Sequence, residues 1–129
     1  MFRQNEDGGF TDITDAARIP ADIRRAALYG AWAADVDTDG DLDVIVARVD
    51  GPVSVLRNNG DGTLLAQSPF AGMLRVRGFV WADVDGEGVP DAVLLDETGT
   101  VRTFLNLRGG EFRERPVPPA FAGLAAIAA

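Results

Sequence analysis

Residues 35–43 read Asp35-Val36-Asp37-Thr38-Asp39-Gly40-Asp41-Leu42-Asp43 and decide how the rest of the chain is interpreted. Aspartates occupy every second position, and Gly40 stands at the sixth position, where it permits a sharp turn. Carboxylates this close repel one another unless a cation lies among them. Hard oxygen donors in a tight loop suit Ca²⁺, which takes about six to eight oxygen ligands. The stretch therefore predicts a loop that wraps around one calcium ion.

The spacing of the acids follows the start of an EF-hand loop. On that pattern the predicted ligands are the side chains of Asp35, Asp37 and Asp39, the carbonyl oxygen of Asp41, and Asp43. An EF-hand closes with a glutamate inside a helix, but the corresponding residue here is Val46, within a β-branched run at residues 42–47. We therefore expect an EF-hand-like loop between two β-strands. The alternative is an acidic surface turn that binds no ion.

A second copy of the motif begins at Asp83, 48 residues after Asp35. It keeps the acidic positions and the glycine at the sixth position, but Glu87 replaces an aspartate. The predicted ligands are Asp83, Asp85, Glu87, the carbonyl oxygen of Val89, and Asp91. Because glutamate is longer by one methylene and Gly86 loosens the loop, we expect weaker calcium binding here. An empty turn is again the alternative.

Turns and short apolar segments recur around the two loops. Residues 2–10, 56–64 and 104–112 each combine an apolar strand end, a turn rich in Asn, Asp or Gly, and a new apolar start, which is typical of a β-hairpin. Four short strands in about 48 residues is the period of a β-propeller blade. We therefore predict an all-β protein of four-stranded antiparallel blades, forming a partial propeller of about two to three repeats.

The repeat divides the chain into four predicted segments. Residues 1–29 are expected to be the end of a preceding blade and its connection, residues 30–77 the repeat with the first calcium loop, residues 78–122 the repeat with the degenerate loop, and residues 123–129 the first strand of a truncated repeat. A short amphipathic helix is the alternative for residues 123–129. Because two blades cannot close a ring, we expect either a fragment of a longer propeller or a piece completed by other copies or subunits.

Together, residues 10–14, 31–35, 35–43 and 56–64 resemble the FG-GAP/VCBS repeat family, the blades of integrin-α-like propellers. The resemblance extends over nearly the whole chain and departs at Glu87 and at residues 108–111, where the Asn-Gly-Asp-Gly turn is altered. It implies that the loop joins two strands of a blade and coordinates Ca²⁺. It also implies an extracellular, cell-surface or periplasmic location, although residues 1–7 do not read as a signal peptide.

Composition excludes several classes of function. The net charge is −8, lysine is absent and the twelve arginines are scattered, which disfavours nucleic-acid binding. The sequence contains no apolar run of about 18 residues, so membrane insertion is not expected. Histidine and cysteine are both absent, which removes the commonest general base and the usual activated nucleophiles.

We therefore expect a non-enzymatic structural or protein-interaction module whose partners are other propeller blades or protein subunits. One alternative is a propeller that recognises a protein or carbohydrate ligand, with Trp32 and Trp81 as a possible platform, although their place in apolar strands favours core packing. A second alternative is an accessory part of a polysaccharide-active enzyme.

Overall fold

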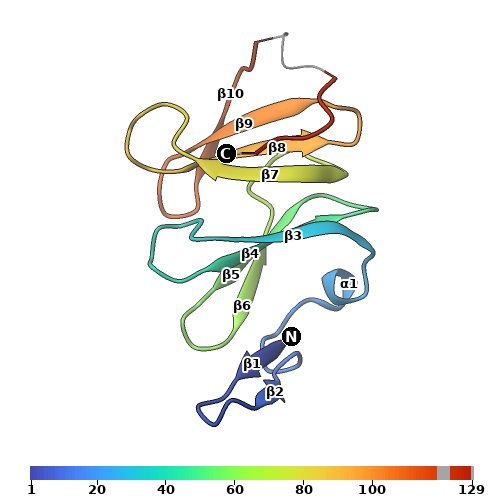
Figure 1. Ribbon diagram of the computed structural model, residues 1–129, viewed down its shortest axis with the longest axis vertical. Helices are drawn as coiled ribbons and strands as arrows, with labels where there is room; N and C mark the ends of the chain where they lie inside the picture. Colours follow the sequence, from blue (N-terminus) through green and yellow to red (C-terminus); the bar gives the residue numbers. More distant parts are fainter. Residues whose placement is uncertain (119–122, 129) are drawn as a thin grey trace.

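A computed structural model describes residues 1–118 and 123–128 of the chain. These residues form two four-stranded antiparallel sheets, a two-stranded hairpin and one short helix (Figure 1). The hairpin consists of β1 (Phe2–Gln4) and β2 (Phe10–Asp12), and the helix α1 (Ala21–Arg24) begins directly after Pro20. The predicted all-β fold with four-stranded antiparallel blades is confirmed.

The first blade contains β3 (Leu28–Ala34), β4 (Asp43–Arg48), β5 (Ser54–Asn58) and β6 (Leu64–Gln67), which are neighbours in the sheet in this order. The second blade contains β7 (Val76–Ala82), β8 (Asp91–Asp96), β9 (Val101–Asn106) and β10 (Phe112–Arg115), again in chain order across the sheet. Each strand therefore pairs with the next one along the chain, as in a meander.

The register of strand pairing in the first blade is repeated in the second. Trp32 pairs with Ile45 in the first blade, and Val80 pairs with Val93, each 48 residues later, in the second. Both β3 and β7 also carry an irregularity in the ladder just before a glycine, between Leu28 and Gly30 and between Val76 and Gly78. The internal repeat in the sequence is thus a repeat in the backbone.

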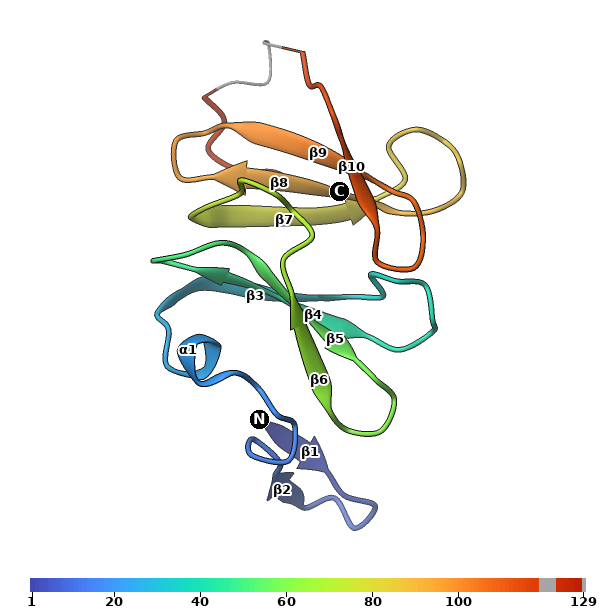
Figure 2. The same cartoon turned by 180° about the vertical axis from the view of Figure 1, so that it is seen from behind.

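The main core lies between the two blades, which are stacked face to face (Figure 1). Its largest fully buried side chains include Phe70, Ile45, Met73 and Leu94. Phe70 belongs to the connection from β6 to β7, which crosses from one sheet to the other (Figure 2). Its ring centroid lies 5.3 Å from that of Phe104 and 5.0 Å from that of Phe112. The connection therefore supplies a central part of the core.

Trp32 and Trp81 are half-buried and pack against this core. The ring centroids of Trp32 and Phe79 lie 5.8 Å apart, and those of Phe79 and Trp81 lie 6.1 Å apart in a stacked arrangement. Aromatic pairs at these separations contribute to packing beyond the area they bury. This arrangement supports core packing over a carbohydrate platform for the two tryptophans.

The opposite face of the first blade packs against the segment that contains α1. Ala17 and Ile23 of this segment are buried against Val46, Leu56 and Leu64 of the sheet. The amide of Leu64 also donates a hydrogen bond to the carbonyl oxygen of Ala17, at 2.9 Å. The first blade is therefore covered on both faces.

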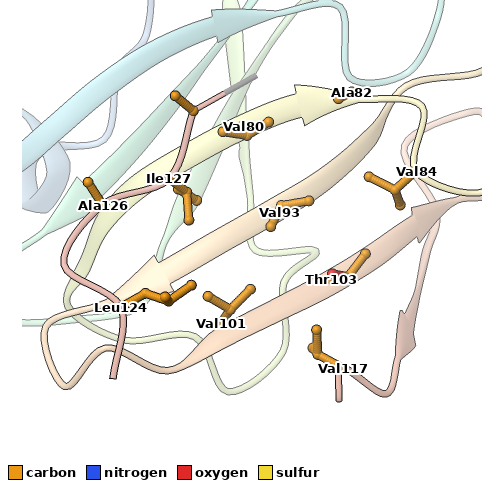
Figure 3. A pocket seen from close by; sticks show the side chains of 11 residues that line it. Val80, Ala82, Val84, Val93, Val101, Thr103, Val117, Leu124, Ala126 and Ile127 are labelled. Carbon is orange, nitrogen blue, oxygen red and sulfur yellow. The ribbon is translucent and has the colours of Figure 1, made fainter. Parts of the chain in front are cut away.

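Residues 123–128 lie along the outer face of the second blade (Figure 3). A Cβ atom at Gly78 would lie 3.0 Å from Cγ1 of Ile127, so the glycine permits this close approach. Residues 123–128 form neither the expected strand nor the alternative helix. They contact a sheet face through their side chains, without a ladder of hydrogen bonds to a neighbouring strand. Ala129 and residues 119–122 lie outside the described residues.

None of the helices in the described ranges is long and apolar enough to span a membrane.

The core between the blades can be tested by truncating Phe70, which is 1% exposed. We expect Phe70→Ala to lower the free energy of unfolding by about 3–5 kcal/mol, because a buried phenyl ring is lost and a cavity remains. Urea denaturation measures this change. Phe10→Ala is the control: Phe10 is 67% exposed, and its removal should change stability by less than about 0.5 kcal/mol. Equal effects of the two substitutions would contradict the assignment of Phe70 to the core.

Candidate metal centre

The first acidic loop connects β3 to β4, two neighbouring strands of the first blade. It brings one carboxylate oxygen each from Asp35, Asp37 and Asp39 to within 4.8 Å of one another. These are the first three predicted ligands of the loop. Carboxylate oxygens gathered in this way are the donor set that hard divalent cations prefer.

Backbone amides hold the exposed side of this loop in shape. Asp35 accepts hydrogen bonds from the amides of Asp39 and Gly40, both at 3.1 Å, and Asp39 accepts one from the amide of Asp41 at 2.9 Å. Gly40 has a φ of 96°, a left-handed conformation that glycine adopts without steric cost. The glycine therefore makes the turn that the sequence pattern predicted.

Asp43 is fully buried and ties the loop to the sheet. One of its carboxylate oxygens accepts a hydrogen bond from the amide of Val36 at 2.8 Å, and the other accepts one from the amide of Asn58 at 2.7 Å. Burial raises the pKa of Asp43 and the nearby charges of Asp37 and Asp39 add to the rise, whereas the two amides oppose it. Asp43 is outside the group of three clustered carboxylates, and its role as a ligand stays a prediction.

Asp37 is the buried member of the cluster, with a side chain that is only 6% exposed. Its Oδ1 atom has no hydrogen-bond partner among the residues that the structure describes. A buried acceptor without a donor costs about 1–3 kcal/mol, and more when it is charged. A cation held by Oδ1 of Asp37 together with Asp35 and Asp39 would satisfy this oxygen, so the residues present fit a metal ion.

The fourth predicted ligand, the carbonyl oxygen of Asp41, is not tested by this geometry and stays a prediction. The Asp41 side chain lies beside the turn between β5 and β6, because a Cβ atom built on Gly60 would lie 3.0 Å from Oδ2 of Asp41. The side chain is thus outside the cluster formed by Asp35, Asp37 and Asp39.

The second blade donates hydrogen bonds to two backbone carbonyl oxygens of the first loop. The carbonyl oxygen of Asp37 accepts a hydrogen bond from the amide of Gly109 at 3.2 Å. The carbonyl oxygen of Val36 accepts one from the side-chain amide of Asn106 at 3.5 Å. Asp37, which presents a carboxylate to the cluster, is therefore also hydrogen-bonded to the second blade.

The second acidic loop connects β7 to β8 and gathers Asp83, Asp85 and Asp91, again with one oxygen each within 4.8 Å. Asp91 repeats the arrangement of Asp43, since it accepts hydrogen bonds from the amides of Val84 at 3.1 Å and Asn106 at 2.8 Å. Glu87 is exposed and does not join this cluster, and the carbonyl oxygen of Val89 remains a predicted ligand.

The second loop is more exposed than the first. Asp83 accepts hydrogen bonds from the amides of Gly88 at 2.9 Å and Gly86 at 2.7 Å, and these bonds lower its pKa. Asp85 is exposed, whereas its counterpart Asp37 is buried. The second cluster is therefore more open to water than the first, and weaker calcium binding there stays a prediction.

Three residues near the first loop were not singled out by the sequence pattern. Arg57 lies beside Asp37, with 3.4 Å between its Nε atom and Oδ2 of Asp37, and Asn106 and Gly109 bond to the loop from the second blade. Comparison of the two repeats could have drawn attention to Arg57, because the matching position in the second repeat is the uncharged Leu105. The contacts from Asn106 and Gly109 join residues about 70 positions apart, and no local pattern reports them.

Residues 35–94 match the FG-GAP-like repeat family. The chain thus contains a repeat of the FG-GAP-like family. The match begins at the first aspartate of the first loop and ends within β8, so it includes both acidic loops and the connection between the blades. FG-GAP-like repeats form propeller blades, and the resemblance seen in the sequence is confirmed. No curated protein matches the sequence significantly.

The role of Asp43 can be separated from that of the clustered carboxylates by two matched substitutions. With calcium removed by a chelator, Asp43→Ala should destabilise the protein by about 2–4 kcal/mol, because two buried amides lose a charged acceptor. Asp39→Ala should cost less than about 1 kcal/mol under the same conditions, since Asp39 is exposed and accepts one hydrogen bond. Urea denaturation measures both values, and equal losses would show that Asp43 does not anchor the loop.

Proposed function

We propose that this chain is a non-enzymatic, calcium-stabilised blade module that serves as a structural and protein-interaction unit. The observation that carries the proposal is the Oδ1 atom of Asp37, which has no hydrogen-bond partner among the described residues and belongs to a buried side chain in a cluster of three acids. Asp35, Asp37 and Asp39 would hold the ion, which supplies the positive charge that the cluster lacks. Oxygen donors alone, in a chain without histidine or cysteine, favour Ca²⁺ over zinc or copper.

The ion would act on stability through the folded loop. The three carboxylates meet only when the loop between β3 and β4 is formed, so the folded chain binds the ion better than the unfolded chain does. Preferential binding to the folded state raises the free energy of unfolding by mass action. Because Asp37 also bonds to Gly109, this stabilisation would extend to the packing of the two blades.

The proposed partners are further blades of the same kind or protein subunits. The outer face of the second blade presents Val80, Val93 and Val101, and it borders a pocket that residues 123–128 cover in part (Figure 3). Repeats that stack face to face bury such surfaces against their neighbours. An extracellular or cell-surface setting, where calcium is plentiful, accords with this role.

We assign no catalytic step to the chain. Within residues 1–118 and 123–128, the acidic side chains that gather in space do so at the two loops, where they contact backbone amides and, in the first loop, Arg57. General acid–base catalysis by a carboxylate pair needs two groups across a substrate cleft. Two clusters within loops, in a sequence without histidine, suit ion binding better.

Thermal denaturation with and without calcium tests the proposal. At a free calcium concentration about one hundred times the dissociation constant, binding at one site should stabilise the protein by about 2.7 kcal/mol, seen as a higher Tm than in a chelator. Isothermal titration calorimetry gives the affinity and the number of ions bound. The same Tm in calcium and chelator, with no heat of binding, would refute the proposed function.

Asparagine substitutions at one exposed cluster member of each loop assign the sites. Asp39→Asn removes a charge from the first cluster but keeps an oxygen that can accept from the amide of Asp41, and Asp85→Asn does the same in the second loop for the amide of Glu87. We expect Asp39→Asn to remove most of the calcium-dependent rise in Tm and Asp85→Asn to remove the smaller part. The reverse order would contradict the ranking of the two loops.

A further inference from the structure

Arg57 places a positive charge beside the first loop from a partly buried position. It lies on β5, and its Nε atom is 3.4 Å from Oδ2 of Asp37, while its side chain is 35% exposed. The contact is an ion pair without hydrogen-bond geometry, since Nε has no hydrogen-bond partner among the described residues. The attraction between Arg57 and the acidic cluster is therefore one of charge.

The two oxygens of Asp37 differ in their surroundings. Oδ2 faces Arg57, whereas Oδ1 has no partner within the part of the chain that the structure describes. An ion held by Asp35, Asp37 and Asp39 would then be contacted by Oδ1, and Asp37 would bridge the ion and the guanidinium. Groups that contact a metal ligand in this way orient it and tune the site.

The second repeat has a leucine at the matching position. Arg57 follows Asp43 by 14 residues, and Leu105 follows Asp91 by the same interval. The backbone geometry is also the same, because the next residue, Asn58 or Asn106, donates its amide to that aspartate at 2.7 or 2.8 Å. The first loop thus has an internal counter-charge at a place where the second loop has an apolar side chain.

We propose that Arg57 is the resident counter-charge of the first loop, which stabilises the ion-free fold and weakens the binding of calcium. This inference rests on the proposed function of the loop. Without an ion, Arg57 offsets the buried charge of Asp37. With an ion present, the same positive charge repels it. Arg57 thereby lowers the affinity for calcium and keeps the fold stable after calcium dissociates.

Calorimetric titration of calcium into Arg57→Leu tests this role, in the Asp85→Asn background so that the first loop dominates the signal. The substitution copies the residue found in the second repeat. We expect calcium to bind about three- to tenfold more tightly, because a unit charge beside the ion is removed. We also expect a lower Tm in chelator and a larger rise in Tm on adding calcium.

Two control variants separate this effect from a general one. Arg57→Lys keeps the charge and should stay within about twofold of the parent affinity, since the Coulomb interaction is retained. Arg115→Leu removes the same charge from an exposed position in β10 and should also stay within about twofold, because exposed charges are screened by salt. A tenfold effect in Arg115→Leu would show that net charge, not the position of Arg57, governs affinity, and would overturn the inference.

The outcomes also distinguish the two proposals. If the parent protein binds no calcium, the proposed function fails. If the parent binds calcium and Arg57→Leu binds it equally or more weakly, the role of Arg57 alone is refuted. Should Arg57→Leu not fold, Leu105→Arg in the Asp39→Asn background decides: affinity at the second loop should fall at least about threefold, and an unchanged affinity overturns the inference.

Discussion

The crowding of negative charge between β3 and β4 is the constraint on which the rest of the structure depends. The loop must bring Asp35, Asp37 and Asp39 together in order to connect two adjacent strands, and it buries one of the three. Like charges at this separation raise the free energy of the folded state unless something offsets them. Three compensations are available: backbone amides bond to Asp35 and Asp39, Arg57 pairs with Oδ2 of Asp37, and the proposed ion would be held by all three side chains.

The two acidic loops lie in different environments because, within the part of the chain that the structure describes, only the first is covered by a neighbouring blade. The first loop is covered by the second blade, so Val36 is 2% exposed and Asp37 is buried. The corresponding Val84 is 41% exposed and Asp85 is open to solvent, since no further sheet covers that loop in the described residues. Burial therefore distinguishes the two candidate sites, in addition to the replacement of an aspartate by Glu87. It follows that a blade packed against the outer face would make the second loop resemble the first.

Much of the fold could be predicted from local patterns. The hairpins expected at residues 56–64 and 104–112 are the turns between β5 and β6 and between β9 and β10, because a turn needs only its own few residues to be specified. The helix α1 starts directly after Pro20, whose ring fixes the backbone in a conformation that suits the start of a helix. The 48-residue period likewise predicted two sheets of identical order.

Contacts between blades could not be predicted in this way. Periodicity shows which residues face a core, but it does not show that Asn106 and Gly109 reach the loop at Val36 and Asp37. The position of residues 123–128 on the sheet face was missed for the same reason, because their composition suits a strand, a helix or irregular chain equally well. The separation of Asp43 from the clustered carboxylates also depends on an amide from another strand, that of Asn58 in β5.

The proposed calcium ion would lie among the carboxylates of Asp35, Asp37 and Asp39. The most direct measurement is X-ray diffraction from crystals grown with calcium or its luminescent analogue terbium, with anomalous scattering used to locate the metal. We expect an anomalous peak about 2.3–2.6 Å from oxygens of these three side chains, including Oδ1 of Asp37. A well-ordered loop with no peak there at millimolar metal would contradict the proposal.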